Sequence, residues 1–337
     1  MDERALLQRL SAGPVSGDAL ARESGQTRAA VWKRVQALRE AGVPVLARPG
    51  RGYSLATPLD LLDADAIEAG IDPAVRARLQ ALEVAWSIDS TNSELLRRGA
   101  AGLEGGAVAL LAERQTGGRG RRGRDWVSPL AAHLYLSLAR RFEAGLARLG
   151  GLSLVAGVAT VEALHALGVE QARLKWPNDI VVETDGVLRK LGGLLVEGGG
   201  EHGGPAHAVI GLGLNVRMPA GDAVAPCIDQ PWCDLAGLDA GPACDRNRLA
   251  ATVLAHWLPA LDTFDADGLA PFLDRYAALD VLTGRAVILH SETGEREAVV
   301  LGLAGDGALR VRLAGGETRS VHSGEVSVRR ATAGASA

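Results

Sequence analysis

The spacing of apolar residues changes twice along the chain, and these changes constrain the fold more than any other feature. Residues 1–58 show three short helical repeats followed by two short strands, whereas residues 59–279 mix strand-like runs with long helical stretches. Residues 280–330 alternate between apolar and polar residues, as short strands do. Because each pattern needs its own packing of helices and strands, the sequence predicts an α+β protein of three domains with these boundaries.

The first domain combines helical repeats with a positive charge. The repeats span Arg4–Leu10, Gly17–Ser24 and Arg28–Glu40. Residues 1–58 contain nine Lys or Arg and five Asp or Glu, a net charge of +4, whereas the whole chain carries −4. A basic domain attached to an acidic body is typical of proteins that bind nucleic acid.

These repeats predict a winged helix-turn-helix. Gly25 stands at the turn before the third helix, which begins after a capping residue, Thr27, and the following strands enclose a glycine-rich basic tip. In such a domain the third helix enters the major groove and the wing contacts phosphates. The alternative is a three-helix module for protein partners, with a solvated basic face. The candidate DNA contacts are Thr27, Arg28, Trp32, Lys33, Gln36, Arg48 and Arg51.

The second and third domains differ in their expected elements. The second has strands at Ala107–Ala112, His133–Leu138 and Val209–Val216 and helices at Leu146–Leu167, Asn247–Phe264 and Leu269–Leu279, which predicts a mixed α/β domain. The third has strands at Arg285–His290, Glu297–Leu303, Leu309–Leu313 and Thr318–Val321. Their regular hairpin spacing favours a small SH3-like β-barrel.

The chain shows no export or membrane signal, so we expect a cytoplasmic protein without a membrane partner. The apolar run Leu149–Val161 is too short to span a bilayer and contains three glycines, which favours a buried helix. Cys227, Cys233 and Cys244 lack the spacing of a zinc site and are expected to be reduced thiols, with no role assigned. We therefore expect no resident metal.

The most unusual segment is a run of glycines and arginines from Gln115 to Trp126. Gly118–Gly123 satisfies the G-x-G-x-x-G pattern of dinucleotide-binding loops, but no amphipathic helix follows it. A loop with this composition can close over anionic groups through its guanidinium groups. Composition alone leaves a basic disordered loop or a nucleic-acid patch equally open.

Other short motifs have both a structural and a functional interpretation. Lys175–Ile180 is a rigid turn that presents an amide and a carboxylate, and Lys190 opens an apolar, glycine-containing strand. Such a lysine is commonly an edge residue, yet beside an arginine loop it is a candidate electrostatic catalyst. Asp89–Asn92 can cap a helix, and Gly211–Val216 can form a bulged or tightly paired strand.

In this order along the chain, Gly118–Arg124, Lys175–Asp179 and Lys190–Gly193 resemble the biotin–protein ligases, also called biotin–acetyl-CoA-carboxylase ligases. With the winged domain, the chain resembles the members that also repress the biotin operon. Lipoate ligases share the fold without the arginine-rich run and are a minor alternative. The resemblance implies a central domain of the biotin/lipoate ligase type.

The resemblance also implies the reaction and the partners. Biotin and ATP, with Mg²⁺, give biotinyl-5′-adenylate, and biotin then passes to a lysine of the biotin carboxyl carrier protein of acetyl-CoA carboxylase. The adenylate would also act as corepressor for a ligand-bound homodimer on operator DNA. A ligase whose head no longer represses remains open, whereas the intact Lys190 and Gly118–Arg124 argue against a repressor without ligase activity.

Finally, the resemblance implies site residues. The catalytic pair would be Lys190 and Arg121. The biotin contacts would be Ser90, Thr91, Asn92, Gln115, Arg119, Gly120, Arg121 and Lys190. The ATP or adenylate contacts would be Arg121, Arg122, Trp126, Lys175, Asn178, Asp179, Asn215 and Trp232, the last of these against the adenine.

Overall fold

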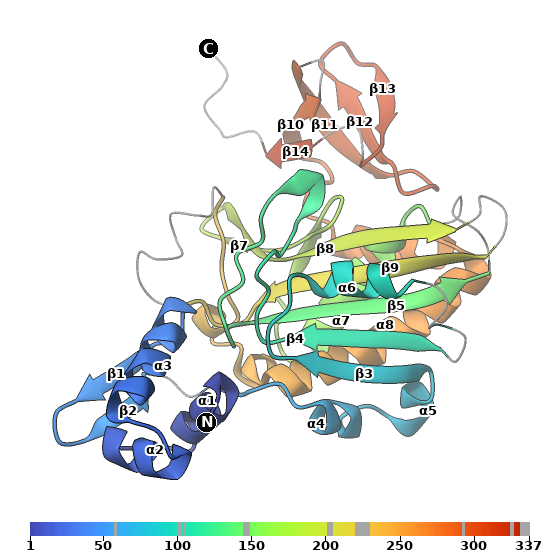
Figure 1. Cartoon of the computed structure of the whole chain (residues 1–337). Helices are drawn as coiled ribbons and strands as arrows, with labels where there is room; N and C mark the ends of the chain where they lie inside the picture. The colour runs from blue at the N-terminus through green and yellow to red at the C-terminus, as the bar shows by residue number, and fades with distance from the viewer. Residues whose placement is uncertain are drawn as a thin grey trace.

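The strands of the described residues form three β-sheets, of two, seven and five strands. The computed structural model describes residues 1–56, 59–99, 103, 106–143, 149–200, 205–219, 230–291, 294–323 and 327–330. Figure 1 shows the N-terminal helices at one end, the seven-stranded sheet in the middle and the five-stranded sheet against its other side. Within these residues, no helix is long and apolar enough to cross a membrane.

The N-terminal elements agree with the predicted helix-turn-helix and wing. They are α1 (Glu3–Ser11), α2 (Gly17–Ser24), α3 (Arg28–Glu40), β1 (Val45–Arg48) and β2 (Gly52–Leu55). The side chains of Asp2, Ser16 and Thr27 each accept a hydrogen bond from the first turn of the helix that follows. Gly25 ends α2 in the left-handed region, with φ 63°, so it forms the predicted turn.

The central sheet has the strand order β3-β4-β5-β9-β8-β7-β6. Its strands are β3 (Leu79–Ala85), β4 (Ala107–Ala112), β5 (His133–Phe142), β6 (Arg173–Lys175), β7 (Asp179–Thr184), β8 (Val187–Gly200) and β9 (Ala206–Asn215). Only β3 and β4 pair in parallel, and the other neighbours are antiparallel. Consequently the sheet is mixed in strand direction, a feature that the sequence analysis did not address.

Helices cover both faces of this sheet, with α7 and α8 on one face and α6 on the other (Figure 1). The helices of this domain are α4 (Ala64–Ala69), α5 (Pro73–Arg76), α6 (Thr91–Arg98), α7 (Leu152–Ala166), α8 (Arg246–Asp267) and α9 (Leu273–Leu279). Eleven of the 15 residues of α7 are buried, which confirms the predicted buried helix.

Two helices begin later in the structure than the sequence predicted. The structure begins α7 at Leu152, because Gly151 has φ 88° and stops the helix there, while residues 144–148 lie outside the described part. The predicted helix Leu269–Leu279 is instead a 3-10 turn, Ala270–Phe272, followed by the short α9. Phe272, with φ −103° and ψ −11°, departs from ideal α-helical values and separates this turn from α9.

The C-terminal strands form an antiparallel sheet of order β13-β12-β11-β10-β14. They are β10 (Ala286–Ser291), β11 (Gly294–Leu303), β12 (Leu309–Leu313), β13 (Thr318–Val321) and β14 (Ser327–Arg330), the last of which was not predicted. The expected SH3-like barrel is not confirmed, because β13 and β14 lie at opposite edges and do not pair in the described residues. The sheet packs on the central domain, where Trp176 Nε1 donates to the Gly307 carbonyl at 3.1 Å.

A buried ion pair holds the segment that leads from the N-terminal domain into the central one. Glu113 and Arg246 lie 2.7 Å apart, and each side chain is 3% exposed. Glu113 also accepts from the Leu62 amide at 2.5 Å, and Arg246 Nε donates to the Asp60 carbonyl at 3.0 Å. Nothing in the local sequence indicated this pair, because its members are far apart along the chain.

Candidate active site

The arginine-rich segment after β4 folds as a tight hairpin-like loop. The Gly120 amide donates to the Arg124 carbonyl at 2.7 Å, and the Trp126 amide donates to the Gly118 carbonyl at 2.9 Å. A Cβ on Gly118 would lie 2.7 Å from Ser128 Oγ, so this position requires glycine. The loop leads into strand β5 rather than a helix, which rules out the dinucleotide-binding fingerprint, as the sequence context indicated.

Five of the eight predicted biotin contacts lie where α6 begins: Ser90, Thr91, Asn92, Gln115 and Arg119. Ser90 caps this helix, and Ser90, Thr91 and Asn92 are all buried. Gln115 Oε1 accepts from the Thr91 amide at 2.9 Å and from its hydroxyl at 3.1 Å, which brings the loop to the helix. A Cβ on Gly211 of β9 would lie 2.3 Å from Asn92 Oδ1. The glycine therefore makes room for the asparagine, and Gly211 serves the close packing that its sequence context indicated.

Arg119 reaches across this group of residues. Its Nη2 donates to Ser93 Oγ at 2.9 Å and lies 3.4 Å from the carboxylate of Glu197 on β8. Asn92 Nδ2 donates to the same carboxylate at 2.9 Å. The sequence analysis missed Glu197, because a single glutamate in a glycine-rich strand gives no local signal of its partners.

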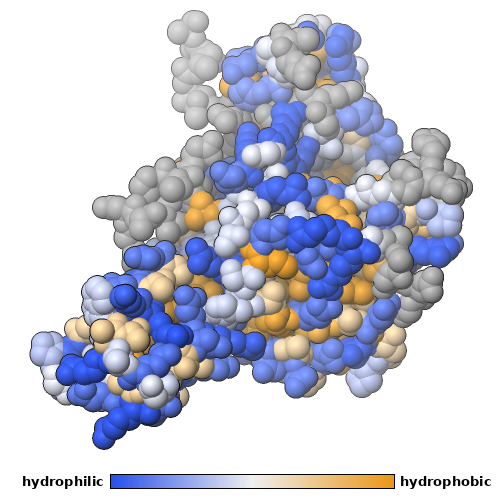
Figure 2. All heavy atoms as spheres, viewed as in Figure 1, coloured by the Kyte–Doolittle hydropathy of each residue, from blue (hydrophilic) through white to orange (hydrophobic). Residues whose placement is uncertain are grey.

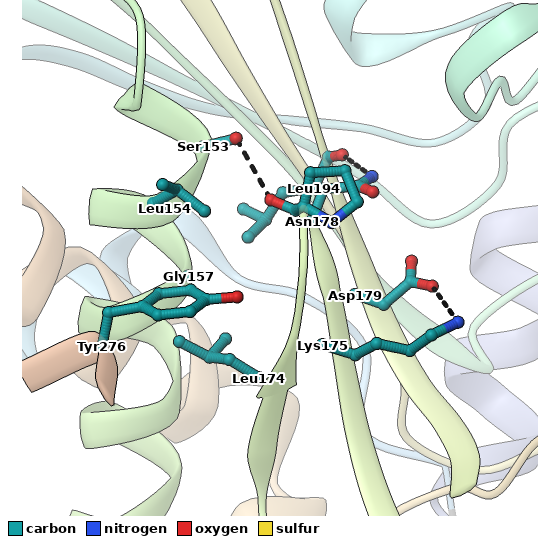
Figure 3. Close-up of a pocket in the computed structure, with 10 residues that line it drawn as sticks. Ser153, Leu154, Gly157, Leu174, Lys175, Asn178, Asp179, Leu194 and Tyr276 are labelled. Carbon is teal, nitrogen blue, oxygen red and sulfur yellow. Dashed lines mark hydrogen bonds and ion pairs between the residues drawn. The ribbon is translucent and has the colours of Figure 1, made fainter. Parts of the chain in front are cut away.

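A group of charged residues lies on the other side of the loop. Lys190 Nζ is 2.7 Å from Asp179 Oδ1, and Lys175 Nζ is 4.0 Å from Asp179 Oδ2. All three side chains are less than one-fifth exposed. Figure 3 shows Lys175 and Asp179 pointing toward each other from adjacent strands. Two cations share one carboxylate here, so the cluster carries a net positive charge suited to an anionic group.

Trp126 connects this charged cluster to the loop. The Lys190 ammonium lies 5.4 Å from the centre of the Trp126 ring, within cation–π range. A Cβ on Gly213 of β9 would lie 2.6 Å from the indole, so the second glycine of that strand makes room for the tryptophan. Lys190 therefore contacts both Trp126 of the loop and Asp179, which the sequence analysis assigned to the nucleotide.

Arg121 joins the loop to two other parts of the chain. Its Nη1 donates to Asn178 Oδ1 at 3.2 Å, and its Nη2 donates to the Ser323 carbonyl in the C-terminal domain. Burial lowers the pKa of the Arg121 guanidinium from its ordinary value, and the neighbouring Arg122 adds to this effect. An anionic ligand beside Arg121 would counter both effects on its pKa. Arg122 itself is exposed at the loop tip, with φ 58°.

Asn215 and Trp232 are placed by the main chain around Lys190. The Lys190 amide donates to the Pro231 carbonyl at 2.9 Å, and the Cys233 amide donates to the Lys190 carbonyl at 3.0 Å, so Trp232 lies beside the lysine. Asn215 Nδ2 donates to the Cys233 carbonyl at 3.0 Å. Asn215 thus holds the segment 231–233 in place, because its side-chain amide nitrogen is directed at the main chain of that segment.

Two observations concern groups to which the sequence analysis assigned no chemistry. Burial raises the pKa of the Cys233 thiol to about 12, so this thiol is neutral, whereas Cys227 lies outside the described residues. Among the residues that the structure describes, no three His, Cys, Asp or Glu side chains cluster in a way that could hold a metal ion.

The candidate DNA contacts lie apart from this site, on α3 and the wing (Figure 1). Trp32 is 53% exposed, and Lys33, Arg48 and Arg51 are also exposed. Arg28 forms an exposed ion pair with Asp18 at 3.2 Å. The Thr27 hydroxyl accepts from the Ala30 amide and Gln36 is half-buried. Figure 2 shows many hydrophilic residues on the visible face of this domain.

Comparisons with known proteins agree with this architecture. Residues 84–215 match the Biotin/lipoate A/B protein ligase family, residues 3–54 match an HTH domain, and residues 282–329 match the Biotin protein ligase C terminal domain. The chain is 41% identical over 316 residues to the bifunctional ligase/repressor BirA of Salmonella typhimurium, which covers 94% of this chain and 93% of that relative.

Two further relatives extend the comparison. A biotin–[acetyl-CoA-carboxylase] ligase of Paracoccus denitrificans is 35% identical over 230 residues, which covers 66% of this chain and 91% of the relative. The structure of a biotin protein ligase from Aquifex aeolicus in complex with biotin and ATP is similar with a TM-score of 0.60 and 27% identity, covering 75% of this chain and 100% of that one. The predicted resemblance is confirmed, and the chain belongs to the biotin/lipoate A/B protein ligase family, with the domain organisation of its bifunctional ligase/repressors.

Proposed function

We propose that this protein is an ATP-dependent biotin–protein ligase and a repressor of the biotin operon. In the first step the biotin carboxylate attacks the α-phosphorus of ATP, which gives biotinyl-5′-adenylate and pyrophosphate. In the second, a lysine of the biotin carboxyl carrier protein of acetyl-CoA carboxylase attacks the acyl carbonyl and AMP leaves. The observation that carries the proposal is the position of Lys190, 2.7 Å from Asp179 and against Trp126, between the two predicted halves of the site.

The biotin half lies between the start of α6 and the loop. Hydrogen-bonding groups on Thr91, Asn92 and Gln115 are buried or half-buried there, which suits a polar ring system enclosed by protein. Arg119 and Lys190 supply positive charge for a carboxylate. The proposed biotin contacts are Ser90, Thr91, Asn92, Gln115, Arg119, Gly120, Arg121 and Lys190.

The nucleotide half lies around Asp179 and the segment at 231–233. Mg²⁺ enters in this proposal as part of the ATP substrate, because Mg²⁺ is commonly held through substrate phosphates. The proposed nucleotide contacts are Arg121, Arg122, Trp126, Lys175, Asn178, Asp179 and Trp232. Asn215 acts on this half through the main chain of Cys233.

The chemistry requires charge neutralisation and exclusion of water rather than a covalent nucleophile. Lys190 and Arg121 stabilise the negative charge that develops between carboxylate and phosphate. The loop covers the mixed anhydride, so that water does not hydrolyse it before the acceptor lysine arrives. Asp179 holds the Lys190 ammonium in place, which reduces the reorganisation needed when the substrates bind.

The repressor activity depends on the N-terminal domain. We divide the chain into a DNA-binding domain at 1–58, a ligase domain at 59–279 and a C-terminal domain at 280–330. Bound adenylate would favour a homodimer, which places two winged domains on two half-sites of the operator. Sedimentation with and without biotin plus ATP tests this coupling. If the chain dimerises equally in both conditions, the adenylate is not a corepressor, and only the ligase part of the proposal stands.

The ligase proposal is tested by incubating the full chain with biotin, ATP–Mg²⁺ and a carrier domain, followed by intact mass spectrometry. We expect the mass of one biotinyl group on the carrier. A carrier with arginine in place of its acceptor lysine, and a reaction without ATP, are the controls. A parallel reaction with lipoate tests the other branch of the family, and transfer of lipoate alone would overturn the biotin assignment.

A further inference from the structure

Trp32, Gln36 and Arg39 form a hydrogen-bonded row along one side of α3. One atom of the Gln36 side-chain amide lies 3.1 Å from Trp32 Nε1 and 3.1 Å from Arg39 Nη1. Both neighbouring groups carry hydrogens and have no lone pair with which to accept, so the amide atom between them is the oxygen. An amide oxygen has two lone pairs, and these two donors occupy both of them.

The row is also attached to the wing. Arg39 Nε donates to the carbonyl of Val45, the first residue of β1, at 2.9 Å. The Arg39 guanidinium therefore has a partner on the wing while its Nη1 faces Gln36. If the Gln36 amide turned over, its NH2 group would meet two groups that can only donate. The row consequently holds this amide in one of its two orientations.

The nitrogen of the Gln36 amide is left for another partner. In the part of the chain that the structure describes, this nitrogen forms no hydrogen bond. Gln36 lies with the exposed Lys33 on the side of α3 opposite the buried Val31, Val35 and Leu38. In a helix-turn-helix, this side of the third helix enters the major groove. Gln36 therefore offers two N–H donors and no acceptor to the bases.

We propose that Gln36 recognises guanine in the operator, and that Trp32 and Arg39 are the positioning residues that select guanine over adenine. The inference rests on the proposed operator binding. A glutamine with a free amide pairs with adenine, because it accepts from N6 and donates to N7. Guanine presents two acceptors, O6 and N7, at the same edge, which suits a group that can only donate. Adenine N6 would find no acceptor on Gln36.

The test is selection of bound duplexes from a random DNA library by the full chain with biotin and ATP–Mg²⁺, followed by sequencing. The position that Gln36 recognises is the one at which Gln36→Ala loses its base preference. There the wild type should select guanine over adenine by about 5- to 150-fold, the discrimination of one good bidentate pair. Selection of adenine at that position would overturn the inference, as would a Gln36→Ala variant that keeps every preference.

Removing one donor of the row tests the positioning role. Trp32→Phe keeps an aromatic ring and removes the indole N–H, so one lone pair of Gln36 Oε1 becomes available to adenine N6. The ratio of guanine to adenine at that position should fall by at least about fivefold. Leu46→Ala removes an exposed apolar side chain from the wing, outside the row, and as the matched control should keep the ratio. An unchanged ratio in Trp32→Phe would overturn the inference, because the row would then not orient Gln36.

A double-mutant cycle separates Trp32 from Gln36. In a Gln36→Ala background, Trp32→Phe should leave the base frequencies at that position unchanged, because the amide that Trp32 orients is gone. A shift of the frequencies in that background would overturn the inference, since Trp32 would then contact the base itself. A wild-type chain that enriches no sequence at all would overturn the proposed operator binding, whereas enrichment of adenine overturns the inference alone.

Discussion

Replacing Lys190 with alanine removes the cation on which the proposed first step depends. The Lys190 side chain is 18% exposed, so it acts in a medium intermediate between water and the protein interior. At an effective dielectric constant of about 20, a charge about 4 Å away interacts with it by about 4 kcal/mol. Asp179, 2.7 Å from the ammonium, offsets part of this field, and Lys175 remains nearby. The variant should therefore lose about 2–4 kcal/mol of transition-state stabilisation, the range measured for comparable electrostatic donors.

That loss corresponds to a decrease of about 30- to 1,000-fold in the rate of adenylate formation. The assay is pyrophosphate release at saturating biotin and ATP, with circular dichroism to verify that Lys190→Ala is folded. Arg78→Ala removes an exposed cation paired with Asp262, away from the site, and should leave the rate unchanged. A folded Lys190→Ala variant that releases pyrophosphate at near the wild-type rate would refute the reasoning, because the cation would then have no part in the step.

Two further predictions concern the N-terminal domain and the core. Lys33→Ala should weaken operator binding and reduce the slope of log affinity against log salt concentration by about one, as the loss of one phosphate contact does. Fluorescence anisotropy at several salt concentrations measures this slope. An unchanged slope would mean that Lys33 does not contact a phosphate of the DNA. Tyr276→Phe should raise the free energy of unfolding by about 1 kcal/mol, because the buried Tyr276 hydroxyl has no hydrogen-bond partner among the described residues. Urea unfolding tests this, and a loss of stability would contradict it.

Much of the fold was predictable because its signals are local. Capping residues and turn glycines gave α2 and α3 their observed bounds, and β4 has the predicted limits as well. The barrel expectation is not confirmed, because hairpin spacing predicts which strands are adjacent but not whether the edge strands meet. The short β14 pairs with β10, which lies at the other end of the domain in the sequence, and a pairing between such distant segments leaves no local sequence pattern.

The site was predictable to a different degree. Motifs with unusual composition, such as the arginine-rich loop and Lys190, stand out because charged residues are rare beside buried strands. Glu197 looks ordinary in sequence, and its place in the site depends on contacts with Asn92 and Arg119, which lie 105 and 78 positions away. Tertiary packing creates that information, so no reading of a single sequence supplies it.

The last prediction concerns the buried His133, the first residue of β5. Burial lowers its pKa from 6.5 to about 3, and the charge of Arg246 adds to the shift. Its Nδ1 accepts from the Val216 amide at 3.1 Å, and its Nε2 faces Met218 Sδ at 3.1 Å, so the neutral ring uses one nitrogen as acceptor and the other as donor. Protonation of Nδ1 would break the first bond and place a charge in the core.

The sign of the pH dependence follows from these two values. Below pH 6.5 the unfolded chain binds a proton at His133 that the folded chain does not, so stability is complete above 6.5 and falls as the pH drops toward 3. Between pH 7.5 and 5.5 this one group should cost about 1.4 kcal/mol of unfolding free energy. Asparagine can supply the same acceptor and donor without titrating, so urea unfolding of His133→Asn at the two pH values should show a smaller loss than the wild type by that amount. If both proteins lose the same stability over this interval, the ring is either protonated in the folded state or exposed to solvent, and the assignment of a buried neutral His133 is wrong.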